Sequence, residues 1–138
     1  MRNKTIVIGS GRLGANIATH LSGQGQDVLI VDKTSDSFRK LSDTYSGYDI
    51  VGDATDLAVL ESSLIEEAKE VIITTNDDNV NLYIAHLCFY IYDVPNIYVR
   101  FSDTDKGQLI EKTTIKAIYP FILSINEFIK LKNLGDQI

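Results

Sequence analysis

Near its amino terminus the chain reads Ile6-Val7-Ile8-Gly9-Ser10-Gly11-Arg12-Leu13-Gly14, an apolar run followed at once by three closely spaced glycines. The run is typical of a buried strand, and the residues after it have the period of a helix. In such a turn the first glycine makes the bend, the second lets a pyrophosphate approach the backbone, and the third packs the helix on the strand. The free N–H groups of the helix start then form an anion site. We expect phosphate binding by Gly9, Ser10, Gly11, Arg12, Leu13 and Gly14; the alternative is a tight turn without a ligand.

A carboxylate follows the next apolar run. Asp32 comes directly after Val28-Leu29-Ile30-Val31, about 20 residues beyond the glycines, where an acidic side chain accepts hydrogen bonds from the hydroxyls of an adenosine ribose. Its charge repels a 2′-phosphate, which favours NAD(H), ATP or ADP over NADP. The neighbouring Lys33 is a weak indication in favour of NADP. The structural alternative is that Asp32 caps a helix that begins at Thr34.

Arg12 lies inside the glycine loop, next to the expected phosphates. A guanidinium there can reach a β- or γ-phosphate, or a nucleotide held by a second molecule across an interface. The alternative is a solvated arginine in the first turn of a helix, a position where a cation is unfavourable unless an anion is near.

The rest of the chain alternates strand-like and helix-like segments. Apolar runs without polar alternation indicate strands buried on both faces, which need a crossover helix between each pair. We expect strands at 5–8, 28–31, 50–51, 71–75, 97–101 and 117–119. We expect helices near 12–23, 35–45, 56–66, 79–92, 105–112 and 121–133. The pattern predicts an α/β fold: a doubly wound Rossmann-type sheet of about six parallel strands with helices on both faces, as one domain over residues 1–138.

Two helical segments, 80–92 and 121–134, are apolar on most of their sides. Such a helix is either buried or packed against a partner. Since a domain of this size cannot wrap both helices completely, we favour self-association over simple burial.

Charge and composition exclude several classes of partner. The net charge is −6, and the sequence shows no stripe of Lys and Arg that would follow a nucleic acid backbone. No segment reaches the roughly 18 apolar residues of a membrane span, so we expect any membrane connection to pass through another protein. A single cysteine, Cys88, offers neither a disulfide nor a cysteine-based metal site and is consistent with a reducing cytoplasm.

The sequence offers no candidate catalytic group. His20 and His86 both fall within helical segments, and no Ser/His/Asp series, zinc-protease motif or P-loop lysine motif occurs. Without an acid or base beside the expected cofactor, hydride transfer has no place to occur. We therefore expect a sensor rather than an enzyme.

Two further blocks suggest a family. Gly52-Asp53-Ala54-Thr55-Asp56 and Thr74-Thr75-Asn76-Asp77-Asp78-Asn79-Val80-Asn81-Leu82, together with the glycine loop and Asp32, resemble the nucleotide-binding regulatory domain of Trk/Ktr potassium transport systems (RCK/KTN, TrkA-N type). The resemblance implies a cytoplasmic regulatory subunit that binds NAD(H) or ATP/ADP. Such a subunit forms a homodimer within an octameric ring and gates a potassium channel or transporter at the inner face of the membrane.

The same resemblance assigns roles to particular residues. Gly9, Gly11, Arg12 and Gly14 would hold phosphates, and Asp32 the ribose. Asp53 and Ala54 would border the adenine. Thr74, Thr75 and Asn76 would line the crevice where the strand order reverses. Arg100, at the end of the fifth expected strand, resembles a basic residue of the family, with a surface arginine as the alternative.

Two departures limit the resemblance. Many members have a glutamate after the proline that follows the sixth strand, where this chain reads Tyr119-Pro120-Phe121. If that carboxylate binds an activating cation, we expect this protein to lack such control. Many members also carry a second ligand-binding domain; this sequence is either a piece covering one domain or a complete short subunit.

Three other functions compete with this interpretation. One is an NAD-dependent oxidoreductase fragment that lacks its substrate domain, and another is a regulator of a cation antiporter. A transcriptional redox sensor would need a basic helix-turn-helix, which the sequence does not show.

Overall fold

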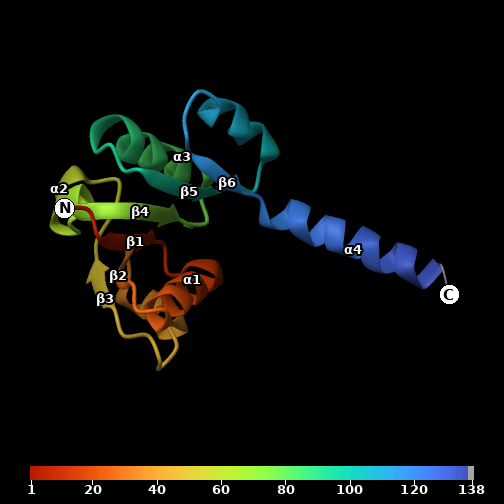
Figure 1. The fold of residues 1–138 in the computed structure, drawn as a ribbon, viewed down its shortest axis with the longest axis horizontal. Helices are drawn as coiled ribbons and strands as arrows, with labels where there is room; N and C mark the ends of the chain where they lie inside the picture. Colours follow the sequence, from red (N-terminus) through yellow and green to blue (C-terminus); the bar gives the residue numbers. More distant parts are fainter. Residues whose placement is uncertain (137–138) are drawn as a thin grey trace.

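The structure, a computed structural model, describes residues 1–136, and at its centre is a six-stranded sheet in which all paired strands are parallel (Figure 1). The strand order is β3-β2-β1-β4-β5-β6. The strands are β1 (Lys4–Ile8), β2 (Asp27–Asp32), β3 (Tyr48–Val51), β4 (Ala68–Ile73), β5 (Asn96–Arg100) and β6 (Lys116–Ile118). The prediction of a doubly wound Rossmann-type sheet is confirmed.

The central strand shows why the apolar runs lack polar alternation. Ile6, Val7 and Ile8 of β1 are each at most 2% exposed. Ile6 and Ile8 belong to the larger apolar cluster, and Val7 belongs to a second cluster that includes Ala18 of the first helix. Since successive strand residues point to opposite faces, an apolar cluster lies on each face of the sheet and both sets of side chains are buried.

Helices cover both faces of the sheet. The α-helices are α1 (Arg12–Gly23), α2 (Leu57–Ser62), α3 (Asp78–His86) and α4 (Pro120–Asp136). Shorter helical turns are η1 (Ser35–Lys40), η2 (Ile65–Glu67), η3 (Leu87–Ile91) and η4 (Thr104–Ile110). In Figure 1, α3 lies above β4, α1 lies below β1, and α2 lies at the left beside the amino terminus.

Four of the predicted helices are wrong in extent or type. The segment expected at 35–45 is a single 3₁₀ helix, because Leu41 and Tyr45 beyond it turn back to pack on the α1 side of the sheet. The segment expected at 56–66 stops at Ser62, and Leu64 takes a left-handed backbone with φ of 63°. The segment expected at 79–92 changes to a π turn in which the Tyr92 amide donates to the Leu87 carbonyl. Residues 104–110 are again a 3₁₀ helix.

β4 ends two residues earlier than predicted, and β5 and β6 each end one residue earlier. β4 stops at Ile73, whereas we expected it to reach Thr75. The amide of Thr75 donates to the side-chain oxygen of Asn81 instead of continuing the ladder.

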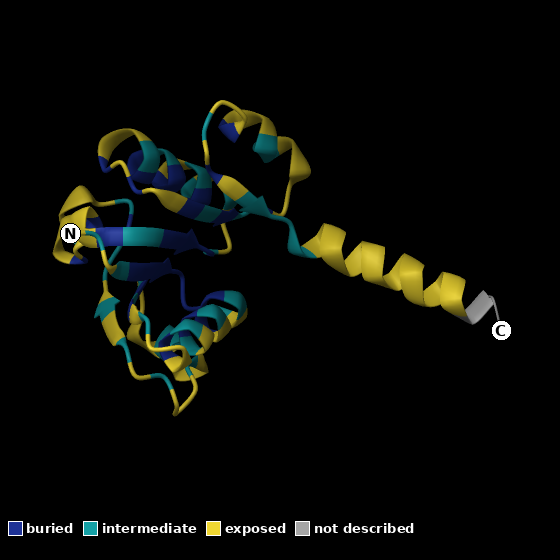
Figure 2. Cartoon of the chain, viewed as in Figure 1, coloured by how far each residue is buried: buried dark blue, intermediate teal, exposed yellow. Residues whose placement is uncertain are grey.

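The two apolar helical segments differ in their surroundings. In the first, burial in the chain's own core accounts for much of the apolar content, since Ile84, Ala85 and Cys88 are each at most 1% exposed. In the second, helix α4 extends away from the sheet, and its residues 121–134 are exposed (Figures 1 and 2). Its large apolar side chains, each 41–64% exposed, are Phe121, Ile122, Leu123, Ile125, Phe128, Ile129, Leu131 and Leu134. No helix within residues 1–136 is long and apolar enough to cross a bilayer.

Cys88 provides a reporter of core opening. Burial raises the pKa of its thiol to about 12. Because only the thiolate reacts, alkylation by iodoacetamide at pH 8 is expected to be about a thousandfold slower in the native protein than in urea. The measurement is mass-spectrometric labelling over time, and labelling of the native protein at the rate of a free thiol would contradict the burial of Cys88.

Candidate functional site

A crevice of about 360 Å³ opens at the carboxyl ends of the strands, around the point where the strand order reverses between β1 and β4. Ligands of doubly wound sheets bind at such switch points. Ten of the fourteen predicted site residues line the crevice: Gly9, Gly11, Asp32, Lys33, Asp53, Ala54, Thr74, Thr75, Asn76 and Arg100. The structure therefore brings together residues from the ends of five strands, β1 to β5.

The three glycines of the loop meet different constraints. Gly9 has a φ of +98°, and a Cβ there would lie 2.9 Å from backbone atoms of Thr74 and Thr75. A Cβ on Gly14 would lie 1.9 Å from the carbonyl oxygen of Gly9. A Cβ on Gly11 would meet nothing within 4 Å. Packing thus explains the first and third glycines, whereas nothing in the described protein explains the second.

The glycine loop leads into the amino terminus of α1. Gly11 is the N-cap residue, no side chain caps the helix, and no acidic residue lies in its first turn. The first N–H groups of a helix have no partner within it, so this end is suited to an anion. Arg12 is exposed, and neither it nor Leu13 lines the crevice.

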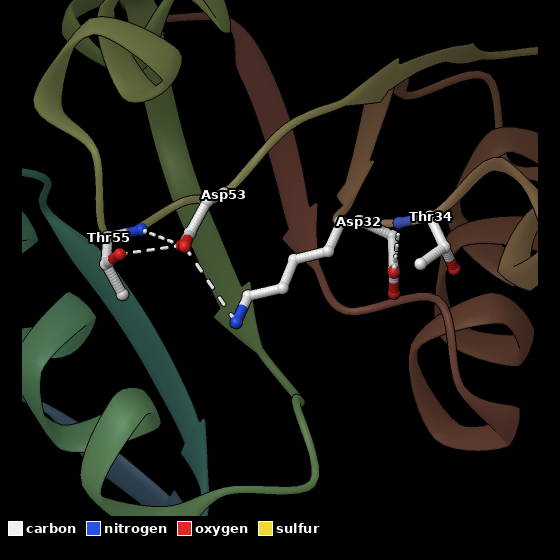
Figure 3. A network of polar contacts seen from close by, with 5 residues as sticks. Asp32, Thr34, Asp53 and Thr55 are labelled. Carbon is white, nitrogen blue, oxygen red and sulfur yellow. Dashed lines mark hydrogen bonds and ion pairs between the residues drawn. The ribbon is translucent and has the colours of Figure 1, made fainter.

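Asp32 holds the glycine loop in place. Its Oδ2 accepts a hydrogen bond from the Ser10 amide at 2.7 Å. Its Oδ1 accepts one from the Thr34 amide at 3.1 Å (Figure 3). Burial raises the pKa of Asp32, but the amides of Ser10 and Thr34 and the hydroxyl of Ser37 outweigh it, so the pKa lies below its ordinary value. Asp32 is therefore ionised at neutral pH, and it closes the turn at Thr34 while facing the crevice.

Ser10 has a structural role. It is fully buried, and its hydroxyl donates to the carbonyl oxygen of Ser37 at 3.1 Å. It does not line the crevice. Its contact ties the glycine loop to η1, which brings Ser37 and Lys40 to the crevice wall. Sequence reasoning missed these two residues because it assigned 35–45 to an ordinary helix.

A second carboxylate lies at the end of β3. The Oδ1 of Asp53 accepts hydrogen bonds from the Thr55 amide at 2.9 Å and the Thr55 hydroxyl at 2.6 Å (Figure 3). Its Oδ2 lies 3.8 Å from the Nζ of Lys33. The Thr55 hydroxyl and amide, with a smaller effect of Lys33, hold the pKa of Asp53 below its ordinary value. Ala54, beside it, is 5% exposed and gives the wall a small apolar surface.

Asn81 organises the far side of the crevice. This fully buried amide accepts from the amide of Thr75 at 3.1 Å and from its hydroxyl at 2.5 Å. It also donates to the carbonyl oxygens of Thr75 and Arg100, at 3.0 and 2.9 Å. Asn81 thus fixes the ends of β4 and β5 relative to each other. We did not assign it a role from sequence, although a polar residue in so apolar a helix was a usable signal.

Arg100, the last residue of β5, also lines the crevice. In the strand order β5 and β2 lie on opposite sides of the switch point between β1 and β4. Its Nε is buried and has no hydrogen-bond partner within residues 1–136. Leaving a buried donor of a charged group unpaired is costly, and an anionic ligand would supply the missing acceptor.

The sheet order, the glycine turn and the crevice at the switch point together define a Rossmann-type domain. The chain belongs to the TrkA-N domain family, whose model matches residues 5–120. It is 31% identical over 122 residues to a "Trk system potassium uptake protein TrkA homolog" of Pyrococcus horikoshii, covering 86% of this chain. The chain spans about half the length of that relative, 53%.

Two solved structures share the fold. The NAD(P)-binding domain of an exopolyphosphatase-related protein from Archaeoglobus fulgidus superposes with a TM-score of 0.77 at 29% identity, covering 96% of this chain and 99% of that chain. The structure of GsuK bound to ADP gives a TM-score of 0.78 at 21% identity, covering 94% of this chain and 33% of that one. At this identity the second likeness concerns the fold alone.

Proposed function

We propose that this domain is a nucleotide sensor that regulates a potassium transport system. It binds an adenine nucleotide, NAD(H) or ATP/ADP, and carries out no reaction on it. The observation that carries the proposal is Gly11, which lines the crevice although no packing contact in the described protein requires a glycine there. A phosphate group close to the backbone accounts for it.

The proposed ligand lies across the switch point. Its phosphates contact the loop from Gly9 to Gly14 and the first turn of α1. Its ribose hydroxyls bind the free lone pairs of Asp32, and its adenine lies beside Asp53 and Ala54. Arg100 takes an anionic group at the other end of the crevice, against the wall formed by Thr74, Thr75 and Asn76.

Arg12 takes a different part in this proposal. Its side chain is exposed and outside the crevice, so it can reach a terminal phosphate, or a nucleotide in a second copy of the chain. The exposed apolar surface of α4 supports such self-association, because a helix that is apolar on most sides is normally packed against a partner. We place the assembly at the cytoplasmic face of the membrane, bound to the transport protein.

Regulation follows from differential binding. A nucleotide shifts an assembly between two geometries only by the difference in its affinity for them. A change in phosphate number at the glycine loop and Arg12 supplies such a difference, and the assembly passes it on to the pore.

Calorimetric titration with ATP, ADP, NAD, NADH and NADPH tests the binding step. We expect at least one of the first four to bind with a Kd in the micromolar range and NADPH to bind at least tenfold more weakly. Asp32→Asn keeps an oxygen for the Ser10 amide but removes the charge, so it is the variant of choice for the ribose contact. Failure of all five nucleotides to bind would refute the proposal.

A further inference from the structure

The adenosine end of the crevice contains a pair of opposite charges, Lys33 and Asp53, and the proposed ligand contacts do not account for their pairing. Lys33 directly follows Asp32, and its Nζ lies 3.8 Å from the Oδ2 of Asp53. Both side chains line the crevice. The pair therefore joins the ends of β2 and β3 beside the proposed position of the ribose.

The two members of the pair are not held equally. Asp53 is anchored through its other oxygen by the amide and hydroxyl of Thr55. The Lys33 side chain is 63% exposed, and within residues 1–136 Asp53 is the carboxylate with which it pairs. The carboxylate is thus the fixed member, and the flexible lysine is drawn toward it.

The pairing of Lys33 with Asp53 affects how well the crevice can bind a nucleotide that carries a 2′-phosphate. Rossmann-type sites accept such a phosphate through a cation near the end of the second strand. Lys33 is a cation at that place, but Asp53 neutralises it and adds its own repulsion. Asp32 alone is therefore not the whole barrier to a 2′-phosphate.

We propose that Asp53 is a positioning residue that sets ligand specificity, by holding Lys33 away from the 2′-position of the ribose. The inference rests on the proposed binding of an adenine nucleotide in this crevice. Freed from Asp53, Lys33 can turn to a 2′-phosphate and form a charge-assisted hydrogen bond with it.

The chain offers a matched control. Lys40 also lines the crevice, yet no carboxylate within residues 1–136 forms an ion pair with it. If any lysine nearby could serve a 2′-phosphate, Lys40 would do so already in the unaltered protein. Its removal separates a general effect of positive charge from the specific effect of Lys33.

The test compares ADP-ribose with 2′-phospho-ADP-ribose, since ADP-ribose contains the part that ADP and NAD share. Affinities are measured by calorimetry for the unaltered protein, Lys33→Met, Asp53→Asn, and Asp53→Asn combined with Lys33→Met or with Lys40→Met. Asparagine at 53 keeps an acceptor for the Thr55 amide, and thermal denaturation checks that each variant folds.

We expect Asp53→Asn to improve the affinity for the 2′-phosphorylated ligand about fivefold to tenfold relative to ADP-ribose. The gain is lost when Lys33→Met is added and kept when Lys40→Met is added. Lys33→Met alone leaves the ratio within about twofold of the unaltered protein.

Several results overturn the inference. One is an affinity ratio between the two ligands that is unchanged in Asp53→Asn, and another is a gain that depends on Lys40. In both cases the proposed function stands if the protein still binds ADP-ribose. If Asp53→Asn does not fold, a large loss of 2′-phosphate affinity in Lys33→Met alone shows that Lys33 is not withheld. If the unaltered protein binds no adenine nucleotide, the proposed function and this inference fall together.

Discussion

Gly11→Ala is expected to leave the free energy of unfolding within about 1 kcal/mol of the unaltered protein while it weakens nucleotide binding about a hundredfold. The Cβ meets no atom within 4 Å in the described protein, and the backbone of Gly11 is extended with φ of −75°. The new methyl group would instead occupy the space of a phosphate against the backbone.

Gly14→Ala is the matched comparison in the same loop. Its Cβ would lie 1.9 Å from the Gly9 carbonyl oxygen and 2.5 Å from the hydroxyl of Thr74. Relief requires a shift of α1 against β1, so we expect a loss of about 3 kcal/mol or more in stability. Urea denaturation and calorimetry on both variants separate the two roles. Normal nucleotide affinity in Gly11→Ala would mean that the loop is only a scaffold.

This division of roles was only partly accessible from sequence. The spacing of the glycines and the strand before them predicted the turn, and an ordered series of apolar runs predicted the sheet. The sequence did not show that the Ser10 hydroxyl donates to the carbonyl of Ser37, or that one carboxylate oxygen of Asp32 accepts the Ser10 amide. Both contacts depend on how η1 packs. Which residues of the glycine loop contact a phosphate therefore stays a prediction.

Replacement of Ile125 and Phe128 by glutamate is expected to convert a self-associated protein into a monomer. The two side chains are 57% and 64% exposed and lie three residues apart, on one side of α4. Burial of each contributes about 1.5–3 kcal/mol, and a glutamate in their place adds the cost of an unpaired buried charge. Sedimentation equilibrium should give a mass near 15.4 kDa for this variant and at least twice that for the unaltered protein.

Asn126→Glu with Asn133→Glu adds the same charge to polar positions of the same helix and serves as control. We expect it to remain associated, because these positions need not enter an apolar interface. A monomeric unaltered protein at concentrations of tens of micromolar would contradict the proposal that α4 packs against a second copy.

The apolar segments illustrate what periodicity can and cannot distinguish. The sequence predicts helices without a broad polar face at 80–92 and at 121–134. It favours self-association for both of them. The structure buries Ile84 and Cys88 in the core, whereas Phe128 stays exposed. The difference arises from chain connectivity: α3 crosses over between two strands of the sheet, whereas α4 follows the edge strand β6 and has no strand to return to within residues 1–136.

The most direct test of the central claim is a titration of the ¹⁵N-labelled protein with ADP and with NAD, followed by amide chemical shifts. We predict that the largest changes fall on the glycine loop, on the amides after Asp32 and Asp53, and on Thr75 and Asn76. Saturation should occur at one nucleotide per chain. Unchanged spectra at millimolar nucleotide, or changes confined to residues outside the crevice, would contradict the claim that this crevice is a nucleotide site.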